Sequence, residues 1–318
     1  MNVLIIGGRG FIGRKLVAAL VLEGYKITVL TRLQADHLNV NTSAITFMTG
    51  DLLDQEFNVD KIIEHFEVIY NCAGEILNES LMYSLHVEAT RRLIDSCKKA
   101  ARKQNHKIHW VQLSSIGVYG SSQLKANTER IVTEETRPSP VGQYEVTKTL
   151  ADEIIVKAAD ELFSFSILRP SNVYGAEMPN NSIRQLAMMI KKGLFFYIGR
   201  PNAISNYVHV DDVVDALVLC GFDPRAKDQV FNLSNDCDQT VVINALAEGQ
   251  SVSSPTIRLN ESFVTIIAFM FSWFPKFPLK KSRIDALVNR THYDTSKIKR
   301  VLGFSPSRDV NKTIVELL

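Results

Sequence analysis

The sequence predicts an α/β protein built on a doubly wound parallel sheet, with a smaller lobe grafted onto its C-terminal half. Two observations support this. Short apolar, β-branched runs alternate with helix-like segments, and the first run leads directly into a glycine-rich turn. The predicted strands are residues 3–6, 26–30, 45–48, 68–71, 109–113, 164–168 and 229–233. The helical patterns lie around residues 12–23, 59–66, 79–103 and 144–161.

The first strand and the turn after it form the most informative segment. Gly8-Arg9-Gly10-Phe11-Ile12-Gly13 fits G-x-G-x-x-G, and Gly7, Gly10 and Gly13 also fit G-x-x-G-x-x-G. Glycines let the backbone approach a pyrophosphate, and the start of the following helix offers free N–H groups. We therefore expect a Rossmann-like dinucleotide-binding turn. The alternative is a strand-to-helix turn whose glycines serve packing alone.

The periodicity becomes irregular after Gly175, which predicts a second structural region. We expect residues 1–174, joined again by 206–234, to form the dinucleotide-binding domain. Residues 175–205 and 235–318 would mainly form a substrate-binding lobe.

The composition is that of an ordinary soluble enzyme, with 318 residues, 46% hydrophobic and 22% charged. A net charge of +2 gives no electrostatic case for nucleic acid. The four cysteines are far apart and the histidines lack metal-ligand spacing, so we expect free thiols and no metal site. The N-terminal apolar run is too short for a signal peptide. These observations predict a cytoplasmic protein.

One apolar stretch, residues 263–274, is too short to span a bilayer. We expect a buried helix or a lid helix in the substrate region. Because Lys276, Lys280, Lys281 and Arg283 follow it, contact of residues 263–283 with a membrane surface is the alternative.

The second predicted strand indicates which dinucleotide is bound. It ends in Thr31-Arg32, where an enzyme specific for NAD usually has an acidic residue for the ribose 2′-hydroxyl. Arg32 and Arg9 both suit a 2′-phosphate, so NADP is favoured over NAD. The alternative is that both arginines are merely solvated. Asp51 and Leu52 follow the third strand, where Asp51 would contact adenine or cap a helix.

Tyr144 and Lys148 form a Y-x-x-x-K pair, which places both side chains on one face of a helix. A phenol has a pKa near ~10, and a neighbouring ammonium together with a positive nicotinamide ring would lower that pKa. Ser115 follows the fifth strand at its carboxyl end, where open α/β sheets bind ligands. A serine hydroxyl there would hold the substrate oxygen that Tyr144 protonates.

These motifs together resemble the extended short-chain dehydrogenases/reductases of the NAD-dependent epimerase/dehydratase type, over nearly the whole chain. Besides the glycine turn, the similar segments are Asn71-Cys72-Ala73-Gly74, residues 115–120, 144–148, 168–175, 207–212 and 294–306. The resemblance implies Tyr144 as acid/base, Lys148 as its partner and ribose ligand, and Ser115 as oxyanion partner. It also implies that Cys72, Ala73, Gly74 and Pro170 lie at the cofactor and that Asn172 lies near the substrate.

Several positions depart from the usual pattern of that family. Arg9 replaces an alanine of the glycine turn, which makes the turn similar to that of NADP-linked ketoreductases such as GDP-fucose synthases. His86 stands where an asparagine is common. Ser205 stands near the place of an arginine that grips the substrate diphosphate. Arg283 is a second candidate for that diphosphate, with a solvated helix arginine as the alternative.

The favoured interpretation is an NADP-linked reductase of a 4-keto nucleotide-sugar. A nucleotide-sugar 4-epimerase, an isomerase that retains NAD, uses the same residues and stays open. Reduction of an apolar ketone is a third possibility, and a cofactor-binding scaffold without catalysis is a fourth. The resemblance also implies a homodimer formed through helices like those around 79–103 and 144–161.

Overall fold

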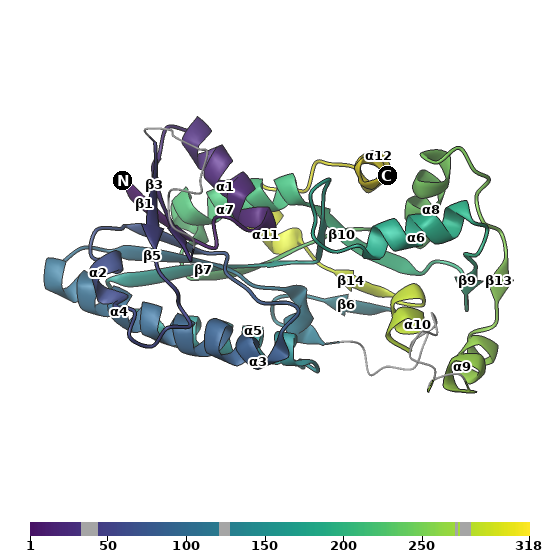
Figure 1. Cartoon of the computed structure of the whole chain (residues 1–318), viewed down its shortest axis with the longest axis horizontal. Coiled ribbons are helices and arrows are strands. Elements are labelled where there is room, and N and C mark those ends of the chain that lie inside the picture. Colours follow the sequence, from purple (N-terminus) through teal and green to yellow (C-terminus); the bar gives the residue numbers. More distant parts are fainter. Residues whose placement is uncertain (33–43, 121–127, 271–272, 274–280) are drawn as a thin grey trace.

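The computed structural model describes residues 1–32, 44–120, 128–270, 273 and 281–318. Its centre is a seven-stranded sheet in the order β11-β7-β5-β4-β1-β2-β3, with every neighbouring pair parallel (Figure 1). The strands are β1 (Asn2–Ile6), β2 (Lys26–Thr31), β3 (Ile45–Thr49), β4 (Val68–Asn71), β5 (Ile108–Leu113), β7 (Phe163–Pro170) and β11 (Gln229–Leu233). The predicted doubly wound parallel sheet is confirmed.

Helices cover both faces of this sheet, as its alternating side chains require. On β1, Val3 and Ile5 pack with α1 (Phe11–Leu22), α7 (Val210–Phe222) and α11 (Ser296–Leu302). Leu4 and Ile6 point the other way and pack with α2 (Asp60–Ile63), α4 (Ala89–Gln104) and α5 (Gln143–Ala158). Successive side chains of a strand point to opposite faces, so one apolar run supplies two cores.

The direction of winding reverses between β1 and β4. From β1 the chain builds outward through β2 and β3, whereas β4, β5 and β7 extend the sheet on the other side. Ligands of open α/β sheets bind at this switch point, outside the carboxyl ends of the strands. The glycine turn follows β1 and residues 72–74 follow β4, so both lie at that point.

The segment 79–103 differs from its prediction as one continuous helix. It consists of α3 (Glu79–Tyr83), a π-helical turn (Ser84–Glu88) and α4. The inserted turn changes the helical register and directs the buried His86 toward α5.

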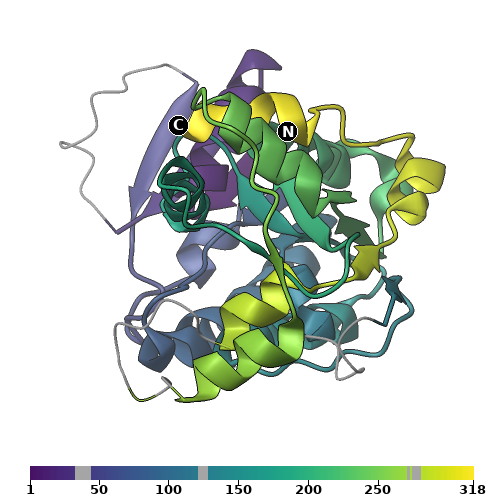
Figure 2. The same ribbon diagram turned by 90° about the vertical axis from the view of Figure 1, so that its right-hand side faces the viewer.

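The remaining elements gather at the end of the molecule away from the N-terminus, which faces the viewer in Figure 2. β8 (Asn172–Tyr174), β10 (Ile204–His209) and β12 (Asn235–Asp238) form a three-stranded sheet. β9 (Tyr197–Ile198) pairs with β13 (Arg258–Leu259), and β14 (Thr291–Tyr293) pairs with β6 (Arg130–Val132). The helices of this region are α6 (Ser182–Lys191), α8 (Gln239–Glu248), α9 (Glu261–Met270), α10 (Lys281–Leu287) and α12 (Val310–Thr313).

This arrangement agrees with a smaller C-terminal lobe, while the exact domain limits stay a prediction. Within the described part of the chain, none of the helices combines the length and the apolar character needed to cross a membrane.

Candidate active site

The glycine turn has the close backbone packing that its sequence predicts. Gly7 has a φ of +77°, and a Cβ there would lie 2.6 Å from the backbone nitrogen of Ala73. A Cβ on Gly13 would collide with the carbonyl oxygen of Gly7. At Gly10 a Cβ would meet only that same oxygen, at 3.3 Å, so this residue faces open space.

Gly10 is also the N-cap of α1, and no side chain caps the helix. The first N–H groups of a helix need a partner, and an uncapped, open N-terminus offers them to an anion. The residues therefore fit the pyrophosphate of a dinucleotide. Phe11 and Ile12 begin α1 beside the open site.

The other residues predicted to bind the cofactor lie after the carboxyl ends of neighbouring strands. Thr31 ends β2 and is buried, and Arg32 after it is exposed, like Arg9. Asp51 and the buried Leu52 follow β3, and the Asp51 carboxylate accepts the Leu53 N–H at 3.0 Å. Cys72, Ala73 and Gly74 follow β4, while Pro170 ends β7. The structure thus brings this whole set to one edge of the sheet.

Ser115 and Tyr144 come from different elements and line the same cavity, of about 1020 Å³. Ser115 follows β5, and its Oγ accepts the Gly117 N–H at 3.0 Å, which fixes the turn. Tyr144 lies in the first turn of α5. A Cβ on Gly117 would lie 2.9 Å from the side chain of Glu145, so the serine turn packs against the start of α5.

The pKa of Tyr144 is raised in the polypeptide alone, whereas the predicted lowering includes a bound nicotinamide ring. Burial raises the pKa of Tyr144 to about 12, and the carboxylates of Glu145 and Asp152 add to the effect. The sequence predicts a lowered pKa from Lys148 and from a bound nicotinamide ring. In the polypeptide, however, the Lys148 ammonium donates to the Leu113 carbonyl at 2.9 Å. At neutral pH the phenol therefore holds its proton at Oη and can donate it.

Lys148 lies one helical turn after Tyr144 and is only 4% exposed. Burial lowers the pKa of Lys148, and the charge of Asp152 opposes this shift. A Cβ on Gly74 would lie 3.7 Å from Lys148 Nζ, so the ammonium lies against the loop after β4. The residues place a cation where the ribose and nicotinamide of a cofactor on this loop would lie.

His86 joins the loop after β4 to the helix that carries Tyr144. The Glu75 N–H donates to His86 Nε2 at 2.9 Å, so the proton of the neutral ring is on Nδ1 and is donated to Thr147 Oγ1 at 2.8 Å. Thr147 Oγ1 in turn donates to a carbonyl of the first turn of α5. The ring of His86 also meets the Tyr144 ring edge-on, with 5.6 Å between centroids. His86 is therefore a positioning residue for Tyr144.

A pH effect on stability follows from this burial. Burial and the nearby Lys148 lower the pKa of His86 to about 3. Below its ordinary value of about 6.5 the unfolded chain binds a proton here that the folded chain does not bind. The free energy of unfolding should therefore decrease as the pH is lowered from about 6.5 toward about 3, by up to about 1.4 kcal/mol per pH unit from this group. Urea unfolding of wild type and His86→Asn at about pH 7 and about pH 5 measures the effect.

The wild type should lose more stability between the two pH values than the variant does. His65→Asn is the matched control, because His65 is exposed. Equal losses in wild type and His86→Asn would contradict the assignment of a buried neutral imidazole.

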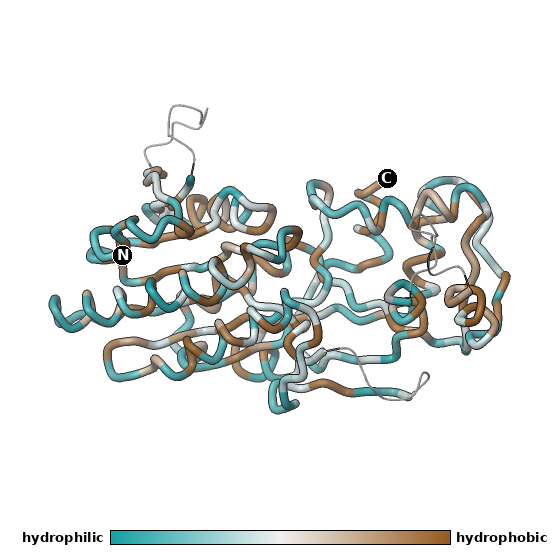
Figure 3. Tube along the Cα trace, turned by 60° about the horizontal axis from the view of Figure 1, so that its bottom comes forward, coloured by the Kyte–Doolittle hydropathy of each residue, from teal (hydrophilic) through white to brown (hydrophobic). Residues whose placement is uncertain are grey.

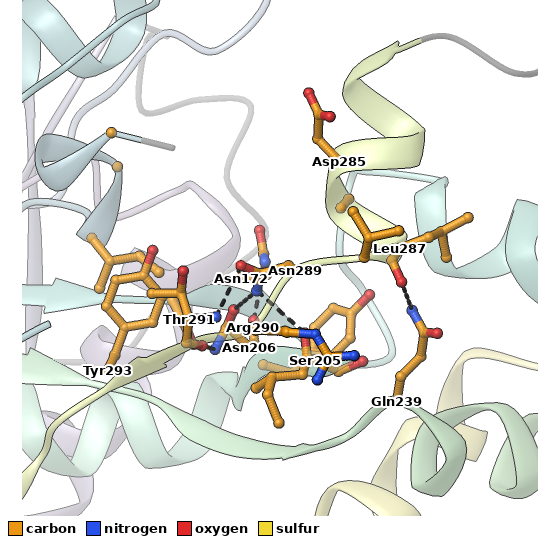
Figure 4. Close-up of a pocket in the computed structure, with 18 of the residues that line it drawn as sticks. Asn172, Ser205, Asn206, Gln239, Asp285, Leu287, Asn289, Arg290, Thr291 and Tyr293 are labelled. Atoms are coloured by element: carbon orange, nitrogen blue, oxygen red, sulfur yellow. Dashed lines mark hydrogen bonds between the residues drawn. The ribbon is translucent and has the colours of Figure 1, made fainter. Parts of the chain in front are cut away.

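Part of the cavity wall is a network of amides (Figure 4). Asn172 Nδ2 donates to the Asn206 carbonyl at 3.0 Å, and Asn206 Nδ2 donates to Asp236 at 2.7 Å and to the Thr291 carbonyl at 2.9 Å. Asn289 Nδ2 donates to Asn206 Oδ1 at 2.6 Å. These amide donors are used within the protein, so the network fixes the shape of the wall.

Besides Ser115, the sequence predicts Asn172 and Arg283 at the substrate, and the structure places these two differently. Asn172 lines the cavity, together with Ser205. The described residues that line the cavity do not include Arg283, which is exposed and donates to Gln185 Oε1 at 3.3 Å. Its role as a diphosphate ligand stays a prediction.

Arg290, which the sequence analysis did not single out, does line the cavity. Its guanidinium donates to the carbonyls of Pro201 and Asn202, and its buried Nε has no partner among the described residues. It stands just before β14, close to the 294–306 motif, and only that proximity could have drawn attention to it.

The described cysteines are free thiols, and among the described residues no three His, Cys, Asp or Glu side chains are arranged to hold a metal ion. A phenol, hydroxyls and amides line the cavity, and the Lys148 ammonium lies one helical turn after Tyr144.

Comparison with known proteins agrees with this geometry. Sterol-4-alpha-carboxylate 3-dehydrogenase (decarboxylating) of Saccharomyces cerevisiae is 26% identical over 98% of this chain and 97% of the yeast protein. dTDP-6-deoxy-L-talose 4-dehydrogenase (NAD(P)(+)) of Kitasatospora kifunensis is 26% identical over 88% of this chain and 93% of that protein. The solved structure of UDP-glucuronic acid 4-epimerase from Bacillus cereus in complex with NAD has a TM-score of 0.72 at 19% identity, covering 100% of this chain and 97% of that one.

The family model of the NAD dependent epimerase/dehydratase family matches residues 3–234, which contain the glycine turn, Ser115, Tyr144 and Lys148. The family uses a nicotinamide dinucleotide, and its named relatives are dehydrogenases and epimerases. The protein is an enzyme of the extended short-chain dehydrogenase/reductase type, and it belongs to the NAD dependent epimerase/dehydratase family.

Proposed function

We propose that this enzyme is an NADP-linked reductase of a 4-keto nucleotide-sugar. The observation that carries the proposal is the convergence of Ser115 and Tyr144 on one cavity, with the buried Lys148 one helical turn after Tyr144. A bound nicotinamide supplies the hydride that goes to the carbonyl carbon. Tyr144 donates its proton to the carbonyl oxygen, and the Ser115 hydroxyl donates a hydrogen bond to the same oxygen.

Two features support a nucleotide-sugar. A cavity of about 1020 Å³ with many hydroxyl and amide groups on its wall suits a large polar ligand. The names of the Kitasatospora and Bacillus proteins specify chemistry at C4 of a nucleotide-linked sugar.

The choice of NADP follows from charges at the end of β2. Arg32 is exposed there, Arg9 is exposed in the glycine turn after the neighbouring strand β1, and Thr31 occupies the place of an acid. The nearby Asp51 carboxylate accepts the Leu53 N–H, and the Glu75 carboxylate near Arg32 accepts the N–H groups of Leu77 and Asn78. Two exposed guanidiniums beside carboxylates that are held by backbone N–H groups favour a 2′-phosphate over a 2′-hydroxyl.

Replacing Arg32 by aspartate tests this choice. Arg32→Asp should weaken the binding of NADPH by about tenfold or more, because it exchanges an attractive charge for a repulsive one at the 2′-phosphate. The binding of NADH, which lacks this phosphate, should be weakened far less. Fluorescence titration of both dinucleotides measures the ratio. Arg225→Asp, an exposed arginine paired with Asp223 on another part of the surface, is the control. Equal losses of affinity for NADPH and NADH would contradict the assignment of Arg32 to the 2′-phosphate.

The cofactor that the purified protein retains tests reductase against epimerase. Mass spectrometry after denaturation identifies any released dinucleotide. A reductase exchanges its cofactor at each turnover, so we expect little retained dinucleotide and tighter binding of NADPH than of NADH. Tightly retained NAD would instead indicate an internal redox cycle and a 4-epimerase.

Reduction of an apolar ketone is the second candidate, because the amide donors on the cavity wall are used within the protein. Cations and carboxylates on the described wall also balance, with Lys281 and Arg290 against Glu145 and Asp285. The yeast relative is named for a sterol. Calorimetric titration with UDP, dTDP and GDP separates the two: a nucleotide-sugar enzyme binds at least one of them, and an apolar-ketone enzyme binds none.

A further inference from the structure

Helix α9 is apolar on more than one face. Val264 and Ala268 are buried against Ile198 and Ile284, in a small core between α9, α10 and β9. This face agrees with the buried helix that the sequence predicts. The rest of the helix does not, because most of its exposed positions are also apolar, with Ser262 and Thr265 as the exceptions.

Five large apolar side chains form what we call the α9 surface. Their exposed fractions are 56% for Phe263, 57% for Ile266, 79% for Phe269, 59% for Met270 and 84% for Trp273. A helix that is apolar all round is normally buried on all sides. Grouped exposed side chains of this size mark an interaction site.

The α9 surface lies at an outer edge of the molecule, at the end away from the N-terminus. Figures 1 and 2 show α9 at this edge beside α10, and the hydropathy colouring shows apolar turns at the same end in Figure 3. A projecting apolar helix fits a broad, deformable partner surface better than it fits a rigid pocket on another protein.

Charges next to this surface favour an anionic partner. Arg258, Lys281 and Arg283 are exposed around α9, against the exposed Asp285 and the half-buried Glu261. Aromatic and aliphatic groups flanked by cations are the chemistry of helices that lie in the interface of an anionic bilayer.

We propose that the α9 surface docks on a lipid bilayer that carries anionic headgroups. The apolar side chains enter the boundary between headgroups and acyl chains, and Lys281 and Arg283 face the headgroups. This inference rests on α9 and α10 and not on the proposed cofactor or substrate. Because Leu287 of α10 packs on the same small core and also lines the cavity, docking brings the cavity close to the membrane.

The two tryptophans of the chain make the test direct. Trp110 is fully buried and Trp273 is 84% exposed, so a change in emission on lipid addition reports Trp273. The full chain is mixed with vesicles of phosphatidylcholine, with and without phosphatidylglycerol. We expect co-sedimentation and a shift of emission to shorter wavelength with the anionic vesicles, both weakened by salt. Brominated lipid should quench the same emission.

Variants distinguish docking through the α9 surface from nonspecific adsorption to vesicles. Phe263→Ser combined with Phe269→Ser should weaken vesicle binding by about tenfold or more. Leu22→Ser is the matched control, because Leu22 is 88% exposed but lies on α1, and it should bind vesicles like the wild type. Thermal melting by circular dichroism establishes that each variant is folded.

Three results would overturn the proposal. The first is no binding to anionic vesicles and no quenching of Trp273 in the wild type. The second is unchanged binding by the folded double variant. The third is a dimer in analytical ultracentrifugation that Phe269→Ser dissociates and vesicles do not, which would assign the α9 surface to a second copy of the chain.

Discussion

Replacing Tyr144 by phenylalanine is expected to lower turnover by about a hundred- to ten-thousand-fold, the usual contribution of a positioned general acid. The variant loses only the hydroxyl that donates a proton, and it keeps the ring that packs edge-on against His86. Lys148 remains held by the Leu113 carbonyl, so the cofactor side of the site is preserved. Steady-state rates and fluorescence titration with NADPH should therefore separate, with a large loss in kcat and little change in Kd.

A matched control is Tyr83→Phe, since Tyr83 is 45% exposed on α3 and does not line the cavity. It should retain the wild-type rate. If Tyr144→Phe keeps more than about a tenth of the activity, another group supplies the proton. A loss of NADPH binding equal to the loss of rate would mean that Tyr144 acts on the cofactor and not on the reacting oxygen.

The strands and the cofactor edge could be predicted because their signals are local. A buried parallel strand appears as an apolar run, and the predicted strand at residues 68–71 agrees with β4 to the residue. The glycine turn similarly specifies its own geometry within seven residues, Gly7 to Gly13, because a Cβ at Gly7 or at Gly13 would strike backbone atoms.

The π-helical turn at Ser84–Glu88 could not be predicted from periodicity. Its apolar positions continue the 3.6-residue pattern closely enough to indicate one helix. The buried partner of His86 is Thr147, 61 residues away, and no pattern within a segment shows a contact at that separation. In the sequence, His86 differs from the asparagine common at its position in the similar family, but nothing there indicates that it contacts Thr147.

The substrate cavity is the least predictable part for the same reason. Asn206 contacts Asn172, Asp236, Asn289 and Thr291, which come from three different segments. Arg283, which the sequence proposes for the diphosphate, is not among the described residues that line the cavity, whereas Arg290, seven residues later, is. The sequence around an isolated arginine near a motif does not indicate whether its side chain faces the cavity or the solvent.

A second large effect, on the free energy of unfolding, is expected from replacing Asp152, which lies one helical turn after Lys148 and forms a buried ion pair with Arg169. Arg169 donates through Nε and Nη2 to Asp152 Oδ2, both at 3.0 Å, and Ser114 Oγ donates to the same oxygen at 2.9 Å. Asp152 is 2% exposed, Arg169 is 7% exposed and Lys148 is 4% exposed. One carboxylate therefore compensates two cations that water does not reach.

Asp152→Ala should lower the free energy of unfolding by about 3–5 kcal/mol, because it leaves buried cations without their counter-charge. Asp152→Asn keeps a side chain of similar shape that can still accept from Ser114, so it should lose stability through the charge alone. Guanidinium unfolding followed by circular dichroism measures both variants.

The neighbouring residue Glu153 gives the matched control. Its partner is Lys157 at 3.6 Å, and these side chains are 53% and 78% exposed. Exposed ion pairs contribute about 0–1 kcal/mol, so Glu153→Ala should change little. If Asp152→Ala and Glu153→Ala differ by less than about 1 kcal/mol, Asp152 does not compensate the buried charges. A difference of the expected size would show that the cation behind Tyr144 depends on a carboxylate one helical turn deeper in the core.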